Sequence, residues 1–199
     1  MDSKIIEAYN KFGDRYDEQT ALFWEQFPKT FIESFRAGLN TGKDILNIGS
    51  GPGRDSLILK MAGFNVTCLD ASESMVEATT TKGFNSVQAD LMELPFGNSS
   101  FDGAWAYTSL LHLPKSKIVH ALQEIKRILK PSGILALGMI EGDEEKYVED
   151  KFVIEPRLFS YYSKSDLESL LEESGFQIYH FEQFTPKRFT YLNFIVSNA

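Results

Sequence analysis

The stretch "ILNIGSGPGRDS", Ile45–Ser56, closes a short apolar run and decides the fold. Three glycines alternate in it, at Gly49, Gly51 and Gly53. Glycine lets the backbone approach a ligand closely, because no Cβ stands in the way. The residues that follow are typical of a helix start, whose free N–H groups and partial positive charge favour ligand binding. The stretch therefore predicts a strand, a turn facing a ligand, and a helix.

From about Asp44 onward, short apolar runs alternate with helical patterns. The clearest helix is expected over residues 115–133, where apolar side chains share one face and Pro131 and Gly133 end the helix. Another is expected over residues 165–175, with a Ser165–Glu168 capping box. Two more helices are expected at residues 55–63 and 72–83. The expected strands are residues 44–49, 64–70, 84–90, 101–107, 134–140, 176–184 and 190–198.

This alternation predicts an α/β fold with a mostly parallel, doubly wound sheet that is covered on both faces. The last two strands have no helix between them, so one of them should run antiparallel. The length of 199 residues predicts a single domain, 1–199, with its α/β core at residues 44–199.

The first part of the chain, residues 1–43, is rich in aromatic side chains and lacks the strand–helix alternation. The spacing of Tyr9, Phe12 and Tyr16 gives a first helix one apolar face. For most of these aromatic residues we expect packing on the sheet. For residues 1–43 as a segment we expect a helical lid over the ligand, outside the sheet core, with Tyr9, Tyr16 and Trp24 as the candidates for ligand contact.

The amino-acid composition limits the kinds of partner that the protein can be expected to bind. The 20 Lys and Arg against 28 Asp and Glu give a net charge of -8, which makes nucleic acid an unlikely main partner because such binding needs clustered basic residues. The single cysteine, Cys68, excludes an intramolecular disulfide and suits a reducing compartment. No signal peptide or stretch of about 20 apolar residues is evident. We expect a cytoplasmic protein with no membrane partner, either monomer or homodimer, and no metal cluster.

Three ligands compete for the glycine loop, and a turn that simply needs glycine is a fourth interpretation. A nucleoside triphosphate loop would continue from its last glycine with Lys and Ser or Thr, but Arg54 follows Gly53. A dinucleotide loop would have a small residue at that same position. The third ligand is S-adenosylmethionine, whose sites use Gly-x-Gly-x-Gly.

Two acidic residues favour the third ligand. Asp70 ends the second expected strand and can accept two hydrogen bonds from a ribose diol. Asp90 ends the third and is placed to accept from an adenine amine. Each alone could instead be a helix cap or turn residue. Two of them beside a glycine loop are harder to explain in that way.

In several stretches of its sequence, the chain resembles the class I S-adenosylmethionine-dependent methyltransferases, in particular small bacterial-type enzymes with methyltransferase domains 11 and 25. The resemblance runs from about Ile45 to Phe176 and implies a seven-stranded sheet, with the seventh strand antiparallel between the fifth and sixth. It rests on "ILNIGSGPGRDS", "VTCLDASESMV", "QADLMELPF", "SFDGAWAYTSLLHLP", "EIKRILKPSGILAL" and "RLFSYYSKSDLESLLEESGF".

The resemblance also implies a set of residues that bind S-adenosyl-L-methionine. Asn47 departs from the pattern, because the family often has an acid there to pair with the cofactor's ammonium. The residues after the fourth strand, Tyr107–Leu110, would border the methyl group and the acceptor. The cofactor-binding candidates are Tyr16, Asn47, Gly49, Ser50, Gly51, Gly53, Asp70, Ala71, Met75, Asp90, Leu91, Tyr107 and Thr108.

The implied activity is methyl transfer to a small-molecule acceptor by in-line displacement, a transferase reaction of class EC 2.1.1.-. Two alternatives stay open, a tRNA wobble-uridine-type methyltransferase and a non-catalytic cofactor-binding partner protein. A dinucleotide-binding oxidoreductase is a third, which Arg54 disfavours.

The sequence contains fewer signals for the residues that would bind or activate the methyl acceptor. His112 is the candidate general base. The alternative for it is packing at a loop-to-helix junction while donating to a backbone carbonyl. The acidic run Glu141–Asp150 is expected to be a solvated loop or to recognise a cationic acceptor, and Arg157–Tyr162 to line the same pocket.

Overall fold

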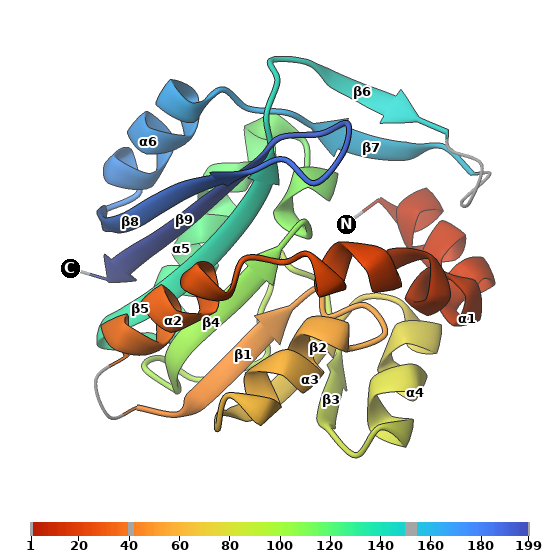
Figure 1. The fold of residues 1–199 in the computed structure, drawn as a ribbon, viewed down its shortest axis with the longest axis horizontal. Helices are drawn as coiled ribbons and strands as arrows, with labels where there is room; N and C mark the ends of the chain where they lie inside the picture. Colours follow the sequence, from red (N-terminus) through yellow and green to blue (C-terminus); the bar gives the residue numbers. More distant parts are fainter. Residues whose placement is uncertain (1, 40–41, 150–154, 199) are drawn as a thin grey trace.

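The structure is a computed structural model that describes residues 2–39, 42–149 and 155–198, and the side chains of residues 12–22 lie outside the description. Its main sheet has seven strands in the order β3-β2-β1-β4-β5-β9-β8 (Figure 1). The strands are β1 (Asp44–Ile48), β2 (Asn65–Asp70), β3 (Asn85–Gln88), β4 (Phe101–Tyr107), β5 (Leu129–Ile140), β8 (Phe176–Phe184) and β9 (Tyr191–Asn198).

The sheet confirms the predicted α/β fold and its one antiparallel strand. The pairs β1–β2, β1–β4, β2–β3 and β4–β5 are parallel. The last strand, β9, runs antiparallel to both neighbours, β5 and β8. Because β8 and β9 are joined without a helix, the chain must reverse between them, and the hairpin places β9 beside β5.

Helices cover both faces of this sheet. On one face lie α2 (Lys29–Gly38) and α3 (Arg54–Met61), and on the other α5 (Ile118–Ile128) and α6 (Lys164–Glu173). Successive side chains of β4 serve the two faces in turn, since Trp105 packs with α2 and Ala104 and Ala106 pack with α5. A further helix, α4 (Glu73–Thr81), lies between β2 and β3 in sequence.

Two predicted helix boundaries are wrong. The helix expected to reach Gly133 ends at Ile128, and the chain is already extended at Leu129, where β5 begins. Pro131 explains this, because a proline disfavours the helical conformation of the residue before it. The same helix starts late, after the 3-10 turns η1 (Leu110–His112) and η2 (Lys115–Lys117).

The cap of α6 is also displaced from its predicted place. Ser163, not Ser165, caps the helix, and its hydroxyl accepts a hydrogen bond from the Asp166 backbone N–H at 3.1 Å. Glu168 bonds to Lys164 instead of closing a capping box. Two serines stand in the run "SKS", and either one offers the same short-range signal.

The N-terminal region divides into two different parts. Phe31 and Phe35 of α2 are fully buried, and both rings lie 5.3 Å from that of Trp105. Therefore α2 is a layer of the core, and the prediction that all of residues 1–43 form a lid is wrong for this helix. The first helix, α1 (Ser3–Glu25), buries Ile5 and Ala8 and packs against α4 near the sheet edge (Figure 1).

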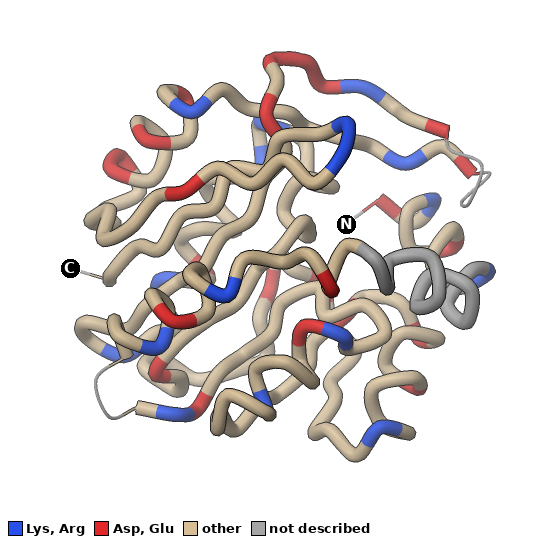
Figure 2. The backbone as a smooth tube through the Cα atoms, in the orientation of Figure 1, with Lys and Arg blue, Asp and Glu red and all other residues tan. Residues whose placement is uncertain are grey.

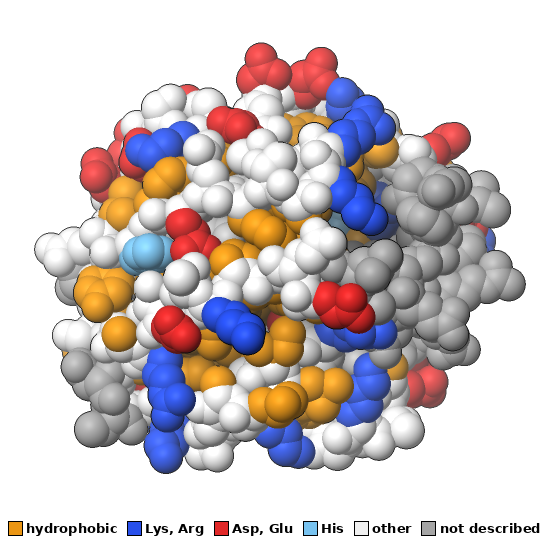
Figure 3. Space-filling view, viewed as in Figure 1, with side chains coloured by type: hydrophobic (Ala, Val, Ile, Leu, Met, Phe, Trp, Pro, Cys, Tyr) orange, Lys and Arg blue, Asp and Glu red, His pale blue; other side chains and the backbone are white. Residues whose placement is uncertain are grey.

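Part of the acidic run is also more regular than predicted. Residues expected in a solvated loop form β6 (Glu145–Val148), which pairs antiparallel with β7 (Arg157–Ser160) in a second, small sheet. Acidic residues remain concentrated on the turn that leads into β6 (Figure 2). On the face seen in Figure 3, Lys and Arg are interspersed with Asp and Glu.

Candidate active site

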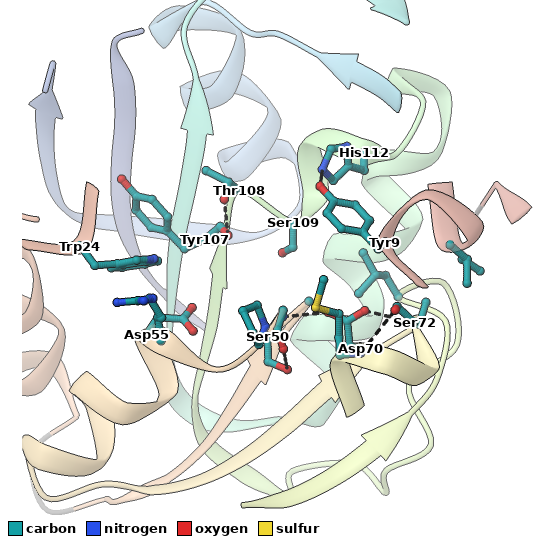
Figure 4. A pocket seen from close by; sticks show the side chains of 18 of the residues that line it. Tyr9, Trp24, Ser50, Asp55, Asp70, Ser72, Tyr107, Thr108, Ser109 and His112 are labelled. Carbon is teal, nitrogen blue, oxygen red and sulfur yellow. Dashed lines mark hydrogen bonds between the residues drawn. The ribbon is translucent and has the colours of Figure 1, made fainter. Parts of the chain in front are cut away.

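A pocket opens at the edge of the sheet where the parallel strands end (Figure 4). In open α/β sheets this edge is where ligands bind. The loops after β1, β2 and β4 form its floor, and α1 covers it from one side. The lining residues are Ile6, Tyr9, Phe23, Trp24, Gly49, Ser50, Gly51, Pro52, Arg54, Asp55, Asp70, Ala71, Ser72, Met75, Leu91, Tyr107, Thr108, Ser109, His112 and Tyr191.

The three glycines of the loop serve different purposes. All have positive φ, 66° at Gly49, 51° at Gly51 and 85° at Gly53. A Cβ on Gly49 would lie 2.3 Å from the Cβ of Ser109, and one on Gly53 would lie 2.9 Å from Thr79 Cγ2. A Cβ on Gly51 would meet nothing within 4 Å. Gly49 and Gly53 therefore make room for the protein itself, and only Gly51 leaves open space towards the pocket.

Asp70 holds this loop in place. Its Oδ2 accepts a hydrogen bond from the Gly51 backbone N–H and its Oδ1 accepts one from the Ser72 N–H, both at 2.9 Å. Ser72 in turn caps α4 by accepting from the Met75 N–H. Burial raises the pKa of Asp70. Each carboxylate oxygen can accept a second bond, so Asp70 has acceptor capacity left for a ligand.

A second carboxylate lies at the opposite end of the pocket, and sequence analysis missed it. Asp55, in the first turn of α3, is 6% exposed. Its Oδ1 accepts from Asn47 Nδ2 at 2.8 Å. Asn47 is fully buried behind it and also donates to Ser56 Oγ at 2.7 Å. Burial raises the pKa of Asp55 to about 7. The signal that could have found it is its position directly after the last glycine and Arg54.

Aromatic rings form the wall above Asp55. Trp24 lies 5.6 Å from Tyr107, and Phe23 lies 5.9 Å from Tyr107 and 5.0 Å from Tyr191. The Tyr107 hydroxyl donates to Asn193 Oδ1 at 2.9 Å and so points away into the protein. Burial raises the pKa of Tyr107 well above its ordinary value. Tyr107 therefore offers a ligand its ring and not its hydroxyl.

His112 bounds the pocket together with Tyr9 of α1. Its Nδ1 lies 2.7 Å from the Leu158 carbonyl oxygen, which can only accept, so Nδ1 carries the hydrogen. Burial lowers the pKa of His112 to about 4, so the ring is neutral and Nε2 is an acceptor. The Tyr9 hydroxyl lies 2.7 Å from Nε2 and donates to it. It also accepts from an Arg157 NH1 group at 2.9 Å.

These contacts match the packing alternative for His112 and still leave it beside the pocket. The hydrogen bond from His112 to a backbone carbonyl is what the packing interpretation predicts. The place of His112 on the pocket wall is what the general-base interpretation requires. The signal that Tyr9 is its partner was absent from the sequence, since the two residues are 103 positions apart.

The structure brings most of the predicted cofactor-binding residues to this pocket. Asn47 and Gly53 lie behind the wall, and Asp90 is outside the lining, where its Oδ1 accepts from the Met92 N–H at 2.9 Å. The side chain of Tyr16 lies outside the described residues. The predicted residues found on the wall are Gly49, Ser50, Gly51, Asp70, Ala71, Met75, Leu91, Tyr107, Thr108 and His112.

Two kinds of feature are absent from the described residues, 2–39, 42–149 and 155–198. No group of three His, Cys, Asp or Glu side chains there could hold a metal ion. No helix there is both long and apolar enough to cross a membrane.

Comparison with known proteins agrees with the geometry. Residues 46–137 match the family model described as "Methyltransferase domain". The chain is 36% identical over 161 residues to 27-O-demethylrifamycin SV methyltransferase of Amycolatopsis mediterranei, covering 68% of this chain and 58% of that protein. It is 31% identical over 156 residues to O-methyltransferase rstn1 of Aspergillus nomiae, covering 70% and 67%. The chain spans only 53–59% of the length of two other curated O-methyltransferases that it matches.

A solved structure gives the same picture of the fold. The 1,6-didemethyltoxoflavin-N1-methyltransferase of Burkholderia thailandensis, with bound 1,6-didemethyltoxoflavin and S-adenosylhomocysteine, superposes with a TM-score of 0.72. The match covers 95% of this chain and 86% of that one at 21% identity, which shows a shared fold. With the glycine loop, Asp70 and the strand order already described, these matches show that the chain belongs to the class I S-adenosylmethionine-dependent methyltransferases.

Proposed function

We propose that the protein transfers a methyl group from S-adenosyl-L-methionine to a hydroxyl oxygen of a small molecule. The observation that carries the proposal is one pocket that brings together residues suited to the cofactor and residues suited to an acceptor. The open glycine Gly51 and the carboxylate of Asp70 line this pocket, and so do Thr108, His112 and Tyr9. The curated relatives named above are O-methyltransferases, which supports oxygen as the acceptor atom.

The residues on the wall fit this cofactor. Gly51 leaves room for a ligand against the backbone. Asp70 has lone pairs left for a ribose diol, and the apolar side chains of Met75 and Leu91 give a flat base a surface to pack on. When bound, S-adenosylmethionine supplies an electrophilic methyl group on a sulfonium whose thioether is a good leaving group.

The protein's own contribution is to position the reactants and to exclude water. Holding an acceptor in line with the methyl group can account for about 7–11 kcal/mol of the barrier. The loop after β4 presents Thr108, with a φ of 55°, and Ser109 at the middle of the pocket. The first helix covers the same space through Ile6 and Tyr9, and we propose that α1 is the lid of a single-domain enzyme.

In this proposal His112 stays neutral at every pH near neutrality, and its Nε2 accepts the hydrogen bond of the Tyr9 hydroxyl. Its cation is disfavoured by burial and by the neighbouring charge of Arg157. The unfolded chain would protonate His112 near its ordinary pKa of 6.5 and the folded chain only near 4. Between these values the unfolded state binds more protons, so His112 contributes a loss of stability as the pH falls through this window.

This predicts a specific nuclear magnetic resonance signature. In protein with ¹⁵N-labelled histidine, the resonances assigned to His112 should stay constant from about pH 8 to about pH 5.5 and should report the neutral Nδ1–H tautomer. The His112→Gln variant identifies the signals. A His112 resonance that titrates near its ordinary pKa of 6.5, or an Nε2–H tautomer, would contradict the arrangement.

The function itself is tested by calorimetry followed by a product screen. We expect the protein to bind S-adenosylmethionine and S-adenosylhomocysteine and not NAD. Incubation with methyl-labelled cofactor and a metabolite extract should then label a small molecule whose new methyl group is on oxygen. Tight binding of NAD alone would overturn the proposal.

Two other results would favour the alternatives raised by the sequence. Cofactor binding with no labelled product in any extract would favour a non-catalytic partner protein. Label in tRNA, with sub-micromolar tRNA binding at physiological salt, would favour the nucleic-acid acceptor, although the net charge of -8 opposes it.

A further inference from the structure

Asp55 has a place in the pocket that the glycine loop and Asp70 do not explain. Its side chain is almost completely buried, yet it belongs to the pocket wall. The Asn47 amide and the Ser56 backbone N–H both donate to its Oδ1, and the Trp105 side chain also favours its charged form. Among the ion pairs between described residues, none involves Asp55. A buried carboxylate without a cation costs stability, so its retention on a pocket wall points to a ligand.

The surroundings of Asp55 select a cation. Trp24 and Tyr107 lie on the same side of the pocket as Asp55 in Figure 4, and the faces of aromatic rings attract positive charge. Asn47 lies behind the pocket wall, where its amide donates to Asp55 Oδ1 and so fixes the carboxylate in this corner. A carboxylate near aromatic faces is therefore suited to an ammonium group.

We propose that Asp55 binds the ammonium group of the cofactor's methionine part, with Asn47 as the residue that positions its carboxylate. This inference rests on the proposed function and adds a residue to it. The amide of Asn47 holds Oδ1 of the Asp55 carboxylate in place.

Burial supports this assignment. In the absence of a ligand the buried position disfavours the charged carboxylate, which is why the pKa of Asp55 is raised to about 7. At about pH 8 the Asp55 carboxylate is charged in the folded protein, and burying this charge lowers the free energy of unfolding. An Asn side chain at this position is neutral and would remove that destabilisation. Asp55→Asn is therefore expected to raise the melting temperature of the ligand-free protein while it weakens cofactor binding.

The test compares two ligands on two proteins by calorimetry at about pH 8. The ligands are S-adenosylhomocysteine and its analogue with hydrogen in place of the α-amino group. We expect the wild type to bind the analogue about tenfold more weakly, in line with the loss of a hydrogen bond to a charged group. Asp55→Asn should bind S-adenosylhomocysteine about tenfold more weakly and the analogue almost unchanged.

Asp70→Asn is the matched control, since it changes a carboxylate at the other end of the same pocket. It should weaken both ligands equally and keep the preference for the amino group. If Asp55→Asn prefers the amino group as strongly as wild type does, Asp55 does not bind the ammonium, and the proposed function still stands. If wild type binds neither ligand, both proposals fail.

Discussion

Gly51→Ala is expected to leave the protein folded and to lower its affinity for S-adenosylhomocysteine by more than a hundredfold. A methyl group at this position meets no protein atom within 4 Å, so the fold can accept it. The same methyl group would project towards the space that the proposed function gives to the cofactor. The φ of 51° adds a strain of about 1–2 kcal/mol, which a stable domain tolerates. Calorimetry and thermal melting measure the two effects separately.

Gly49→Ala is the matched control, because it carries similar strain at a φ of 66° but a different contact. Its methyl carbon would lie 2.3 Å from Ser109 Cβ, so β1 and the loop after β4 would have to move apart. Overpacking of this kind costs about 1–3 kcal/mol, and we expect a clear drop in melting temperature. If Gly51→Ala binds the cofactor as well as wild type does, the loop does not form the cofactor cradle.

The sequence predicted the sheet well because its signals are short-range and physically strong. Apolar runs that end in glycine or aspartate specify strands β1 to β3, and the helical patterns between them require parallel crossovers. The antiparallel place of β9 follows from the missing helix before it. These features depend on neighbours in sequence, so no knowledge of tertiary contacts was needed.

The features that were missed depend on tertiary contacts. Helix α2 is part of the core because Phe31 and Phe35 pack against Trp105. In sequence, an aromatic-rich helix that covers a core cannot be distinguished from one that covers a ligand. The carboxylate of Asp55 reaches the pocket only because α3 begins just before it, at Arg54. Asn47, by contrast, turns into the protein, although its position in the motif predicted a ligand contact.

Tyr9 links α1 to the rest of the pocket, and Tyr9→Phe is expected to weaken that link. The phenol hydroxyl donates to His112 and accepts from Arg157, so its removal costs both groups a hydrogen bond in a partly buried place. Bonds to charged groups are worth about 1.5–3 kcal/mol, which corresponds to roughly 10- to 100-fold in an equilibrium. We expect hydrogen exchange in the first turns of α1 to speed up by about this factor.

If α1 is a lid, Tyr9→Phe should lower the rate of methyl transfer more than it lowers cofactor affinity. Cofactor binding in this proposal relies on the loop after β1 and on Asp70, which hold each other through the Gly51 N–H, so Tyr9→Phe should lower cofactor affinity only slightly. Methyl transfer to the acceptor found in the product screen should fall by about 10- to 100-fold, because the acceptor end loses its cover and admits water.

Lys11→Met separates this effect from the general attachment of α1. Lys11 also bridges α1 to the segment before β7, through a 2.8 Å ion pair with Glu155, but its side chain is 60% exposed. Exposed ion pairs contribute little to stability because water and salt screen them, so this variant should change exchange and turnover little. If both variants behave as wild type, α1 is packing alone and not a lid. If both are equally impaired, any tether on α1 matters, and the buried bonds of Tyr9 to His112 and Arg157 have no special role.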